Sequence, residues 1–442
     1  MLINKIFITK KYLLNFLISF IPLSILIGNL AININVVLVC LLGIIIYRFQ
    51  IFKINQKVYQ YLLYGFFSYL ILITLISNLP NLNIDTVYYK LHIFKSFFFL
   101  RFLVFFLVIN KLAEEKSFNL KLFFISSAFF SFFLAADIYI QVIFGKDLLG
   151  YSITSVRPSG FFGPESIAGG YIQKFSLFFL FLIILNFFNK KNNKSIFYLY
   201  CVLIFFFTSI LLTNNRMPSI LYITSIFLFF LIEKRFKFLF ITSFVCFICF
   251  SSLTKYSENL NRSFTIFYNN SKEIILRSPS LFYYNTINNN VGYAGSGHWK
   301  SSGYLLTFNS AIQTWKKNKI LGGGLKSFKL NCSNNETEMC NAHPHNYILE
   351  ILVDTGLIGF ALIYSTFIVA ILNFFKFYIK NFNLPSRVIS VPFFLIIFFE
   401  FFPIRSSGSF FTTGVSVIIF LMLALLINVS RLSLLKKNYK KM

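Results

Sequence analysis

Long apolar runs recur from one end of the chain to the other and dominate its sequence. A helix needs about 20 apolar residues to cross the hydrocarbon core of a bilayer. We place runs of this kind at 13–31, 34–52, 58–79, 93–110, 121–143, 171–189, 196–213, 219–233, 237–253, 350–375, 388–404 and 414–430. The sequence therefore predicts an all-α polytopic membrane protein of about 12 transmembrane helices. The runs 219–233 and 414–430 are shorter, and we expect them to be tilted or partly re-entrant.

The composition agrees with a membrane protein and excludes a string of soluble domains. Of the 442 residues, 57% are hydrophobic and 12% are charged, against roughly 25% charged residues in soluble domains. We therefore expect residues 1–442 to form a single membrane domain. The net charge of +27 is scattered between apolar runs rather than gathered into one patch, which disfavours nucleic-acid binding and leaves membrane lipid or a phosphate substrate as partners.

The lysines and arginines predict the orientation of the chain. They concentrate at both chain ends and in the loops that follow even-numbered runs, whereas the short loops after odd-numbered runs hold few of them. By the positive-inside rule both termini are cytoplasmic. The long polar stretch 254–345 then lies outside, between helices 9 and 10, and carries short helices, among them 304–317, which the glycines at 322–324 follow.

The cysteines in the apolar runs read as buried hydrophobes, so we predict no metal site and no cofactor. Cys332 and Cys340 differ, because they flank a polar stretch inside the long loop. We expect them to form a disulfide if that loop lies outside the cytosol.

The segment from His343 to Asn346 ends the long loop and opens an apolar run. Asn346 suits the N-cap of the helix that follows. The partial positive charge of a helix N-terminus disfavours imidazolium, so His345 is expected to stay neutral, as a general base must. Glu350 lies one turn further along and is a support candidate, as is His343. The alternative is that these are solvated residues at the membrane interface.

Two arginines lie in other loops on the predicted outer side. Arg157 stands in a glycine- and proline-rich re-entrant loop, and Arg216 in a tight turn at a membrane edge. Arginine is costly near hydrocarbon, and its planar fork matches phosphate oxygens. Both are therefore candidates for binding a phosphate, the alternatives being contact with lipid headgroups or an ion pair such as Arg157 with Glu165.

Three sequence blocks make the chain resemble a known family. His345-Asn346, then nine residues, then Gly356-Leu-Ile-Gly359 resembles the signature of the O-antigen ligase and polymerase superfamily of bacterial surface-polysaccharide assembly. Ile320–Phe328 resembles the glycine turn of that family, and Arg157–Gly163 resembles its re-entrant loop. The resemblance covers roughly residues 100–360 and is closer to the ligases.

The resemblance implies a metal-independent glycosyltransferase of lipopolysaccharide biosynthesis in the bacterial inner membrane. The donor would be a glycan on undecaprenyl diphosphate, and the acceptor lipid A–core or another glycan on the periplasmic face. His345 would be the base, and Arg157 and Arg216 would bind the donor diphosphate. Many members carry a third cation near the helix before the glycine turn, where this chain offers Lys300 or His298.

Several functions remain open at this stage. An O-antigen polymerase would use the same chemistry to join lipid-linked repeats, and protein glycosylation also occurs in the superfamily. A transporter or flippase of lipid-linked glycans would share the 12 helices, but it predicts two pseudo-symmetric halves. A non-enzymatic assembly partner would tolerate the loss of His345.

Overall fold

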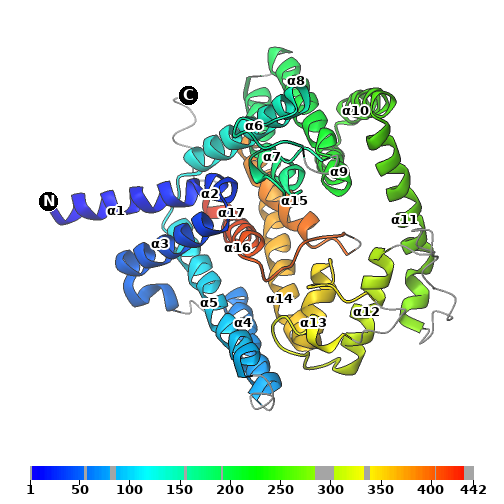
Figure 1. Ribbon diagram of the computed structural model, residues 1–442. Coiled ribbons are helices and arrows are strands. Elements are labelled where there is room, and N and C mark those ends of the chain that lie inside the picture. The colour runs from blue at the N-terminus through cyan, green and yellow to red at the C-terminus, as the bar shows by residue number, and fades with distance from the viewer. Residues whose placement is uncertain are drawn as a thin grey trace.

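The computed structural model describes residues 2–53, 57–79, 86–153, 157–190, 193–283, 303–332, 339–403 and 405–432. Over these residues the chain is helical and has no β-strand, which confirms the predicted all-α fold (Figure 1). The longer helices are α1 (Leu2–Ser19), α3 (Asn29–Tyr47), α4 (Val58–Asn78), α5 (Thr86–Glu114), α6 (Leu120–Phe144), α7 (Ala168–Lys190), α8 (Asn193–Leu212), α9 (Arg216–Ile232), α10 (Phe236–Tyr256), α11 (Glu258–Tyr283), α14 (Tyr347–Lys380) and α16 (Thr413–Ile427). The shorter ones are α2 (Ile21–Ile27), α12 (Gly303–Lys317), α13 (Phe328–Asn331), α15 (Val391–Glu400) and α17 (Val429–Leu432), with 3-10 turns η1 (Arg48–Phe52), η3 (Gly160–Phe162) and η4 (Pro385–Ser390).

The described helices are those of a multi-pass membrane protein. Eight of them are long and apolar enough to cross a membrane, and the bent pair α1 and α2 adds a ninth if it is one span. Within the same residues, α9 and α16 are apolar but shorter, as the sequence analysis expects. The predicted run 388–404 forms only the short α15, which ends at Glu400. Each of the 12 predicted runs thus falls on a helix, and the number that crosses the bilayer stays a prediction.

The first apolar run, 13–31, forms a bent pair of helices rather than one straight helix. α1 ends at Ser19, α2 begins at Ile21, and the two are bent by 49°. Pro22 lies in the first turn of α2, where its missing N–H leaves no helical bond unmade. Gly28 then adopts φ +120°, a conformation open to glycine, and turns the chain into α3.

The helix α16 lies at the centre of the protein. Its residues from Ser416 to Ile427 are all buried, and α3, α5, α14 and α15 pack around it. Phe420 contacts the rings of Phe67, Phe99 and Phe102 with centroids 5.4 to 6.3 Å apart, and such aromatic contacts contribute much of the buried apolar area. The segment that leads into α16 is therefore held in the middle of the molecule.

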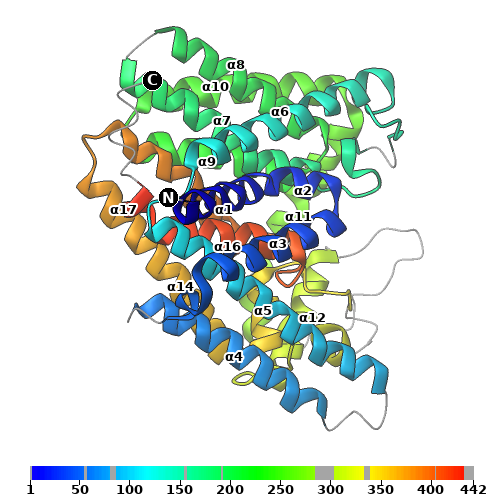
Figure 2. The same ribbon diagram turned by 90° about the vertical axis from the view of Figure 1, so that its left-hand side faces the viewer.

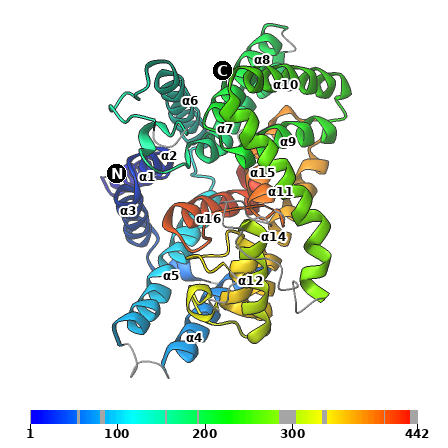
Figure 3. The ribbon, with the colours of Figure 1, turned by 45° about the vertical axis from the view of Figure 1, so that its right-hand side comes forward.

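The predicted long loop 254–345 is largely helical where the structure describes it. α10 runs to Tyr256 and α11 begins at Glu258, so only Ser257 separates them, and its hydroxyl accepts from the amide of Leu260 at 3.3 Å. α11 extends from α10 to α12 along one side of the molecule (Figure 3). α12 confirms the predicted helix 304–317. The sequence analysis did not predict α11, because its many polar residues conceal an amphipathic pattern.

The long helices have one end where α17 lies and an opposite end towards α2, α11 and α12 (Figure 2), and these two ends differ in the residues they carry. At the end where α17 lies, Glu233 pairs with Arg387 at 2.5 Å and accepts from the hydroxyl of Tyr378. Lys57 pairs with Glu114 at the same end. At the opposite end, towards α2, α11 and α12, the helices α7, α9, α14 and α16 begin, and the candidate site lies among their first residues.

Candidate active site

One cavity of about 590 Å³ lies where these four helices begin. Residues from the loops that lead into them line it, and the loop that leads into α16 is residues 405–412, which we call the 405–412 segment. Of the residues that the sequence analysis selected, the cavity is lined by Arg157, Arg216, His343 and His345. These come from three loops far apart in the sequence, so the fold brings together side chains that were predicted separately.

The two histidines stand side by side just before α14. Their ring centroids are 4.2 Å apart, and the backbone N–H of His345 donates to Nδ1 of His343 at 3.1 Å. His345 has φ +57°, a backbone conformation that residues other than glycine rarely adopt. Such strain persists only where the surroundings hold it and is common at functional sites. Here the backbone N–H of Ser407 donates to the carbonyl of His345 at 2.8 Å.

Both histidines favour the neutral form. Burial, and to a smaller extent the nearby His345 and Lys326, lower the pKa of His343 to about 4. Burial also lowers the pKa of His345, while a hydrogen bond with the backbone of Ser407 opposes part of that change. His343 already uses Nδ1 as an acceptor, so its other nitrogen carries the proton.

Arg157 lies in the loop between α6 and α7. Gln141 of α6 shapes this loop, because its Oε1 accepts from the amides of Ser159 and Gly160, both at 2.9 Å. Gly160 has φ +53°, which favours glycine. Within the described part of the chain, Arg157 makes no ion pair with Glu165, so the structure does not support that alternative.

Arg216 is the first residue of α9 and is positioned by α11. Its Nη1 donates to the carbonyl of Ser263 at 3.2 Å, and its guanidinium lies 5.8 Å from the ring centroid of Phe267. Both contacts come from the helix that the sequence analysis missed. That helix therefore holds a predicted site residue at the wall of the cavity.

Asn346 and Glu350 hold the 405–412 segment rather than contacting the histidines. Asn346 is the N-cap of α14, as predicted, and accepts from the amide of Leu349 at 3.1 Å. Its amide donates to the carbonyls of Pro403 and Arg405 at 2.7 and 3.0 Å. Glu350 is buried and accepts from the hydroxyl of Ser409 at 2.5 Å and from the next amide along at 2.6 Å. Both side chains thus pin this segment against α14 beside the histidines.

Gly356 meets a loop rather than a neighbouring helix. It interrupts α14 with φ +60°, and a Cβ there would lie 2.2 Å from the carbonyl oxygen of Ile320. The freed amides of Leu357 and Ile358 donate to the carbonyls of Lys319 and Ile320 at 2.9 and 3.3 Å. The glycine turn after α12 therefore inserts into a break in α14.

Asp354 completes this junction. Its carboxylate accepts from the amides of Lys326 and Ser327 at 2.7 and 3.0 Å and from the hydroxyl of Ser327 at 3.0 Å. The amides of Gly323 and Gly324 donate to carbonyls of α14 at 2.9 and 2.8 Å. Asp354 thus fixes the glycine turn.

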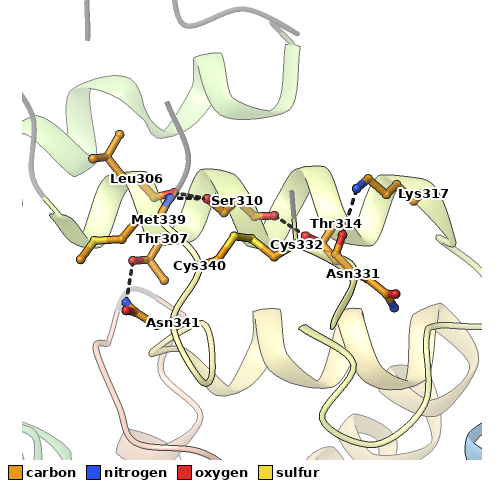
Figure 4. Close-up of a disulfide and its surroundings, with 10 residues drawn as sticks. All are labelled: Leu306, Thr307, Ser310, Thr314, Lys317, Asn331, Cys332, Met339, Cys340 and Asn341. Atoms are coloured by element: carbon orange, nitrogen blue, oxygen red, sulfur yellow. Dashed lines mark hydrogen bonds between the residues drawn. A yellow bond between two sulfur atoms is a disulfide. The ribbon is translucent and has the colours of Figure 1, made fainter. Parts of the chain in front are cut away.

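A disulfide joins Cys332 to Cys340 on the surface of α12 (Figure 4). The chain beyond it is tied to the same helix, since the amide of Asn341 donates to the hydroxyl of Thr307 at 3.3 Å (Figure 4). The connection from α12 to the histidines is therefore braced by a covalent bond.

A charged trio was not selected from the sequence. Lys174 of α7 and Arg405 each pair with Glu400 at the end of α15, at 3.0 and 2.9 Å. The sequence signal was three charges near apolar runs, which usually mark function in a membrane. The sequence alone does not predict that these three residues form ion pairs, because the pairing depends on how α7 packs on α15. The third cation suggested by the resemblance, Lys300 or His298, lies outside the described residues.

Comparison with known families supports the resemblance. Residues 200–364 match the family model described as O-antigen ligase. This range contains Arg216, His345 and Gly356, whereas Arg157 and Arg405 lie outside it. Comparison with curated proteins finds no match to the chain. The predicted resemblance to the O-antigen ligase superfamily is confirmed over the matched residues.

Proposed function

We propose that this chain, in which residues 200–364 match the O-antigen ligase family, moves a glycan from undecaprenyl diphosphate to an acceptor hydroxyl on lipid A–core. The reaction takes place on the periplasmic face of the inner membrane, with both termini in the cytoplasm. Residues 1–442 act as one membrane domain, and no metal or cofactor takes part. The family match supports a membrane glycosyltransferase of the ligase or polymerase type in general.

The observation that carries the proposal is the shared cavity of two histidines and two arginines. His343, His345, Arg157 and Arg216 line the same space at the ends of membrane helices. Apolar side chains such as Ile25 line it as well. A lipid-linked diphosphate needs this combination, because its phosphates require cations while its prenyl chain requires apolar walls.

His345 serves as the general base. The acceptor hydroxyl attacks the anomeric carbon, a new C–O bond forms, and the hydroxyl proton passes to the ring nitrogen of His345 that accepts. Burial favours the neutral ring at pH 7, the form that can take up this proton. His343 presents a proton-bearing nitrogen and is therefore a hydrogen-bond donor rather than a second base.

Arg157 and Arg216 stabilise the leaving diphosphate. The bond from the anomeric carbon to the phosphate oxygen breaks with its electron pair, so negative charge grows on the diphosphate. Fixed cations aimed at growing charge lower the barrier, which removes the need for a general acid. Replacing either arginine by lysine keeps the charge but removes the planar fork, and we expect transfer to fall at least tenfold, roughly the worth of one charge-assisted bond.

Transfer by purified variants tests the base. His345→Ala should reduce the transfer rate by about 10² to 10⁴, the usual contribution of a general base. His92→Ala is the matched control, because this buried imidazole lies on α5, with Nδ1 3.1 Å from the carbonyl of Leu325. It should retain transfer per folded molecule. Wild-type turnover by His345→Ala at normal membrane expression would refute the assignment.

The surface glycans of a deletion strain separate ligation from the alternatives. Bare lipid A–core with polymer accumulating on undecaprenyl diphosphate is expected for a ligase. Lipid A–core capped with single repeats would instead indicate a polymerase. Donor trapped on the cytoplasmic leaflet would indicate a transporter and overturn the proposal.

A further inference from the structure

Lys174, Glu400 and Arg405 form a buried group with a surplus positive charge. The side chains are 13%, 3% and 10% exposed. Two cations share one carboxylate oxygen, at 3.0 and 2.9 Å, so the group carries a net charge of +1. A buried charge without a counter-ion is costly, and proteins rarely keep one without a use.

The pair of Glu233 and Arg387 shows what a purely structural ion pair looks like in this protein. It lies at the opposite end of α9, with one cation and one carboxylate at 2.5 Å. Arg387 uses both Nε and Nη2 on that carboxylate. In contrast, the hydrogen bond of Arg405 to the Phe399 carbonyl and its ion pair with Glu400 both use Nη1, and its Nε is buried without a hydrogen-bond partner among the described residues. Holding the helices together therefore does not require the second cation.

The surplus charge faces the cavity. Lys174 and Arg405 line the cavity, while Glu400 is not among its lining residues and stands behind them. The hydroxyl-rich residues that follow Arg405, from Ser406 to Ser409, line the cavity too. This arrangement, with cations in front, a carboxylate behind and hydroxyls beside them, is suited to binding an anion.

We propose that Lys174 and Arg405, backed by Glu400, form a subsite for the charge that appears on the diphosphate when the glycan leaves. This inference rests on the proposed function. A glycan-linked diphosphate carries two negative charges, for which Arg157 and Arg216 supply two positive charges, while the exposed carboxylate of Glu165 also lies at the cavity wall. Breakage of the glycosidic bond places its electron pair on the diphosphate as a third negative charge, and the trio supplies the matching +1. An interaction gained only in the transition state raises kcat rather than binding of the donor.

Neutralising the lysine tests this charge balance. Lys174→Met leaves Arg405 and Glu400 as a neutral pair, and we expect kcat to fall by about 10- to 100-fold with the donor KM little changed. Affinity for inorganic pyrophosphate, which resembles the product in charge, should fall at least tenfold. Lys57→Met is the matched control, because Lys57 also pairs with a glutamate, Glu114, at the opposite end of the helices. It should change neither quantity.

A double variant separates charge from folding. Lys174→Met with Glu400→Gln leaves Arg405 alone and restores a net charge of +1, so kcat and pyrophosphate affinity should recover at least in part. Unchanged kcat and pyrophosphate affinity in Lys174→Met would overturn the inference, as would the same loss in the single and double variants.

Glycan transfer and pyrophosphate binding by the wild-type protein distinguish failure of this inference from failure of the proposed function. A wild-type protein that neither transfers glycan nor binds pyrophosphate would refute the proposed function itself, whereas transfer that is insensitive to Lys174 would refute only the subsite. Binding is measured in phosphatidylcholine nanodiscs, with phosphatidylglycerol as competitor. If phosphatidylglycerol displaced pyrophosphate as well as unlabelled pyrophosphate does, the site would be a general site for anionic lipid headgroups and the inference would be overturned.

Discussion

Gly356→Ala should break the junction between the glycine turn and α14. The wild-type residue has φ +60° and ψ −166°, a combination essentially confined to glycine, and alanine there costs about 1–3 kcal/mol. Its Cβ would also lie 2.2 Å from the carbonyl oxygen of Ile320, so the turn has to move away. Four backbone hydrogen bonds join the turn to α14 here, and losing two of them at about 1 kcal/mol each brings the total to roughly 3–5 kcal/mol.

The free energy of unfolding in detergent, followed by denaturant titration, measures this loss. Gly65→Ala is the matched control, because Gly65 lies on α4 and its Cβ would meet only Leu362 of α14, at an ordinary 3.4 Å. That substitution should be neutral or stabilising by up to about 1 kcal/mol, the helix propensity difference. Equal stability of Gly356→Ala and wild type would refute the view that α14 needs a glycine here so that the glycine turn can pack against its backbone.

Three further outcomes are expected. Because burial lowers the pKa of His345 from 6.5, the base stays unprotonated as the pH falls through 6.5, so kcat/KM should decline only below that value; a midpoint at or above 6.5 would contradict the assignment. Cys332→Ser opens a loop with a sequence separation of 8 residues and should cost about 2.5 kcal/mol by the loop-entropy relation; reductant should destabilise wild type equally and leave the variant unchanged. The carboxylate of Glu350 accepts hydrogen bonds from two donors, and in Glu350→Gln an N–H₂ group would face one of these donors instead of an oxygen. We expect the variant to be less stable by about 1–3 kcal/mol and to show faster hydrogen exchange across residues 405–412. Unchanged exchange would show that Glu350 does not hold this segment.

Features encoded within a few residues were predictable from the sequence. The N-cap at Asn346 and the helix 304–317 follow from local chemistry, and the structure has both. The loops of Arg157 and Arg216 were placed together by the parity of the apolar runs, and both arginines line one cavity. This prediction requires only the number of membrane-spanning runs that precede each loop, and it does not require knowledge of how the helices pack.

Features that depend on packing were not predictable. Glu400 meets Lys174 only because α15 lies against α7, and no local pattern pairs two residues so far apart in the sequence. Gly356 reads as a packing glycine in an apolar run until its positive φ is known. The polar face of α11 lowers its hydropathy, so the sequence alone places the helix that positions Arg216 within a loop.

The pinning of the 405–412 segment by α14 bears on when the site forms during synthesis. Domains are made from the N-terminus at about 5–20 residues per second, so both histidines leave the ribosome before Arg405 does. Until then Asn346 and Glu350 lack the groups they bind, and His345 lacks the Ser407 amide that holds its carbonyl. The nascent protein therefore has no finished site while its earlier helices insert, and a chain released before residue 405 would be inert towards lipid-linked donors.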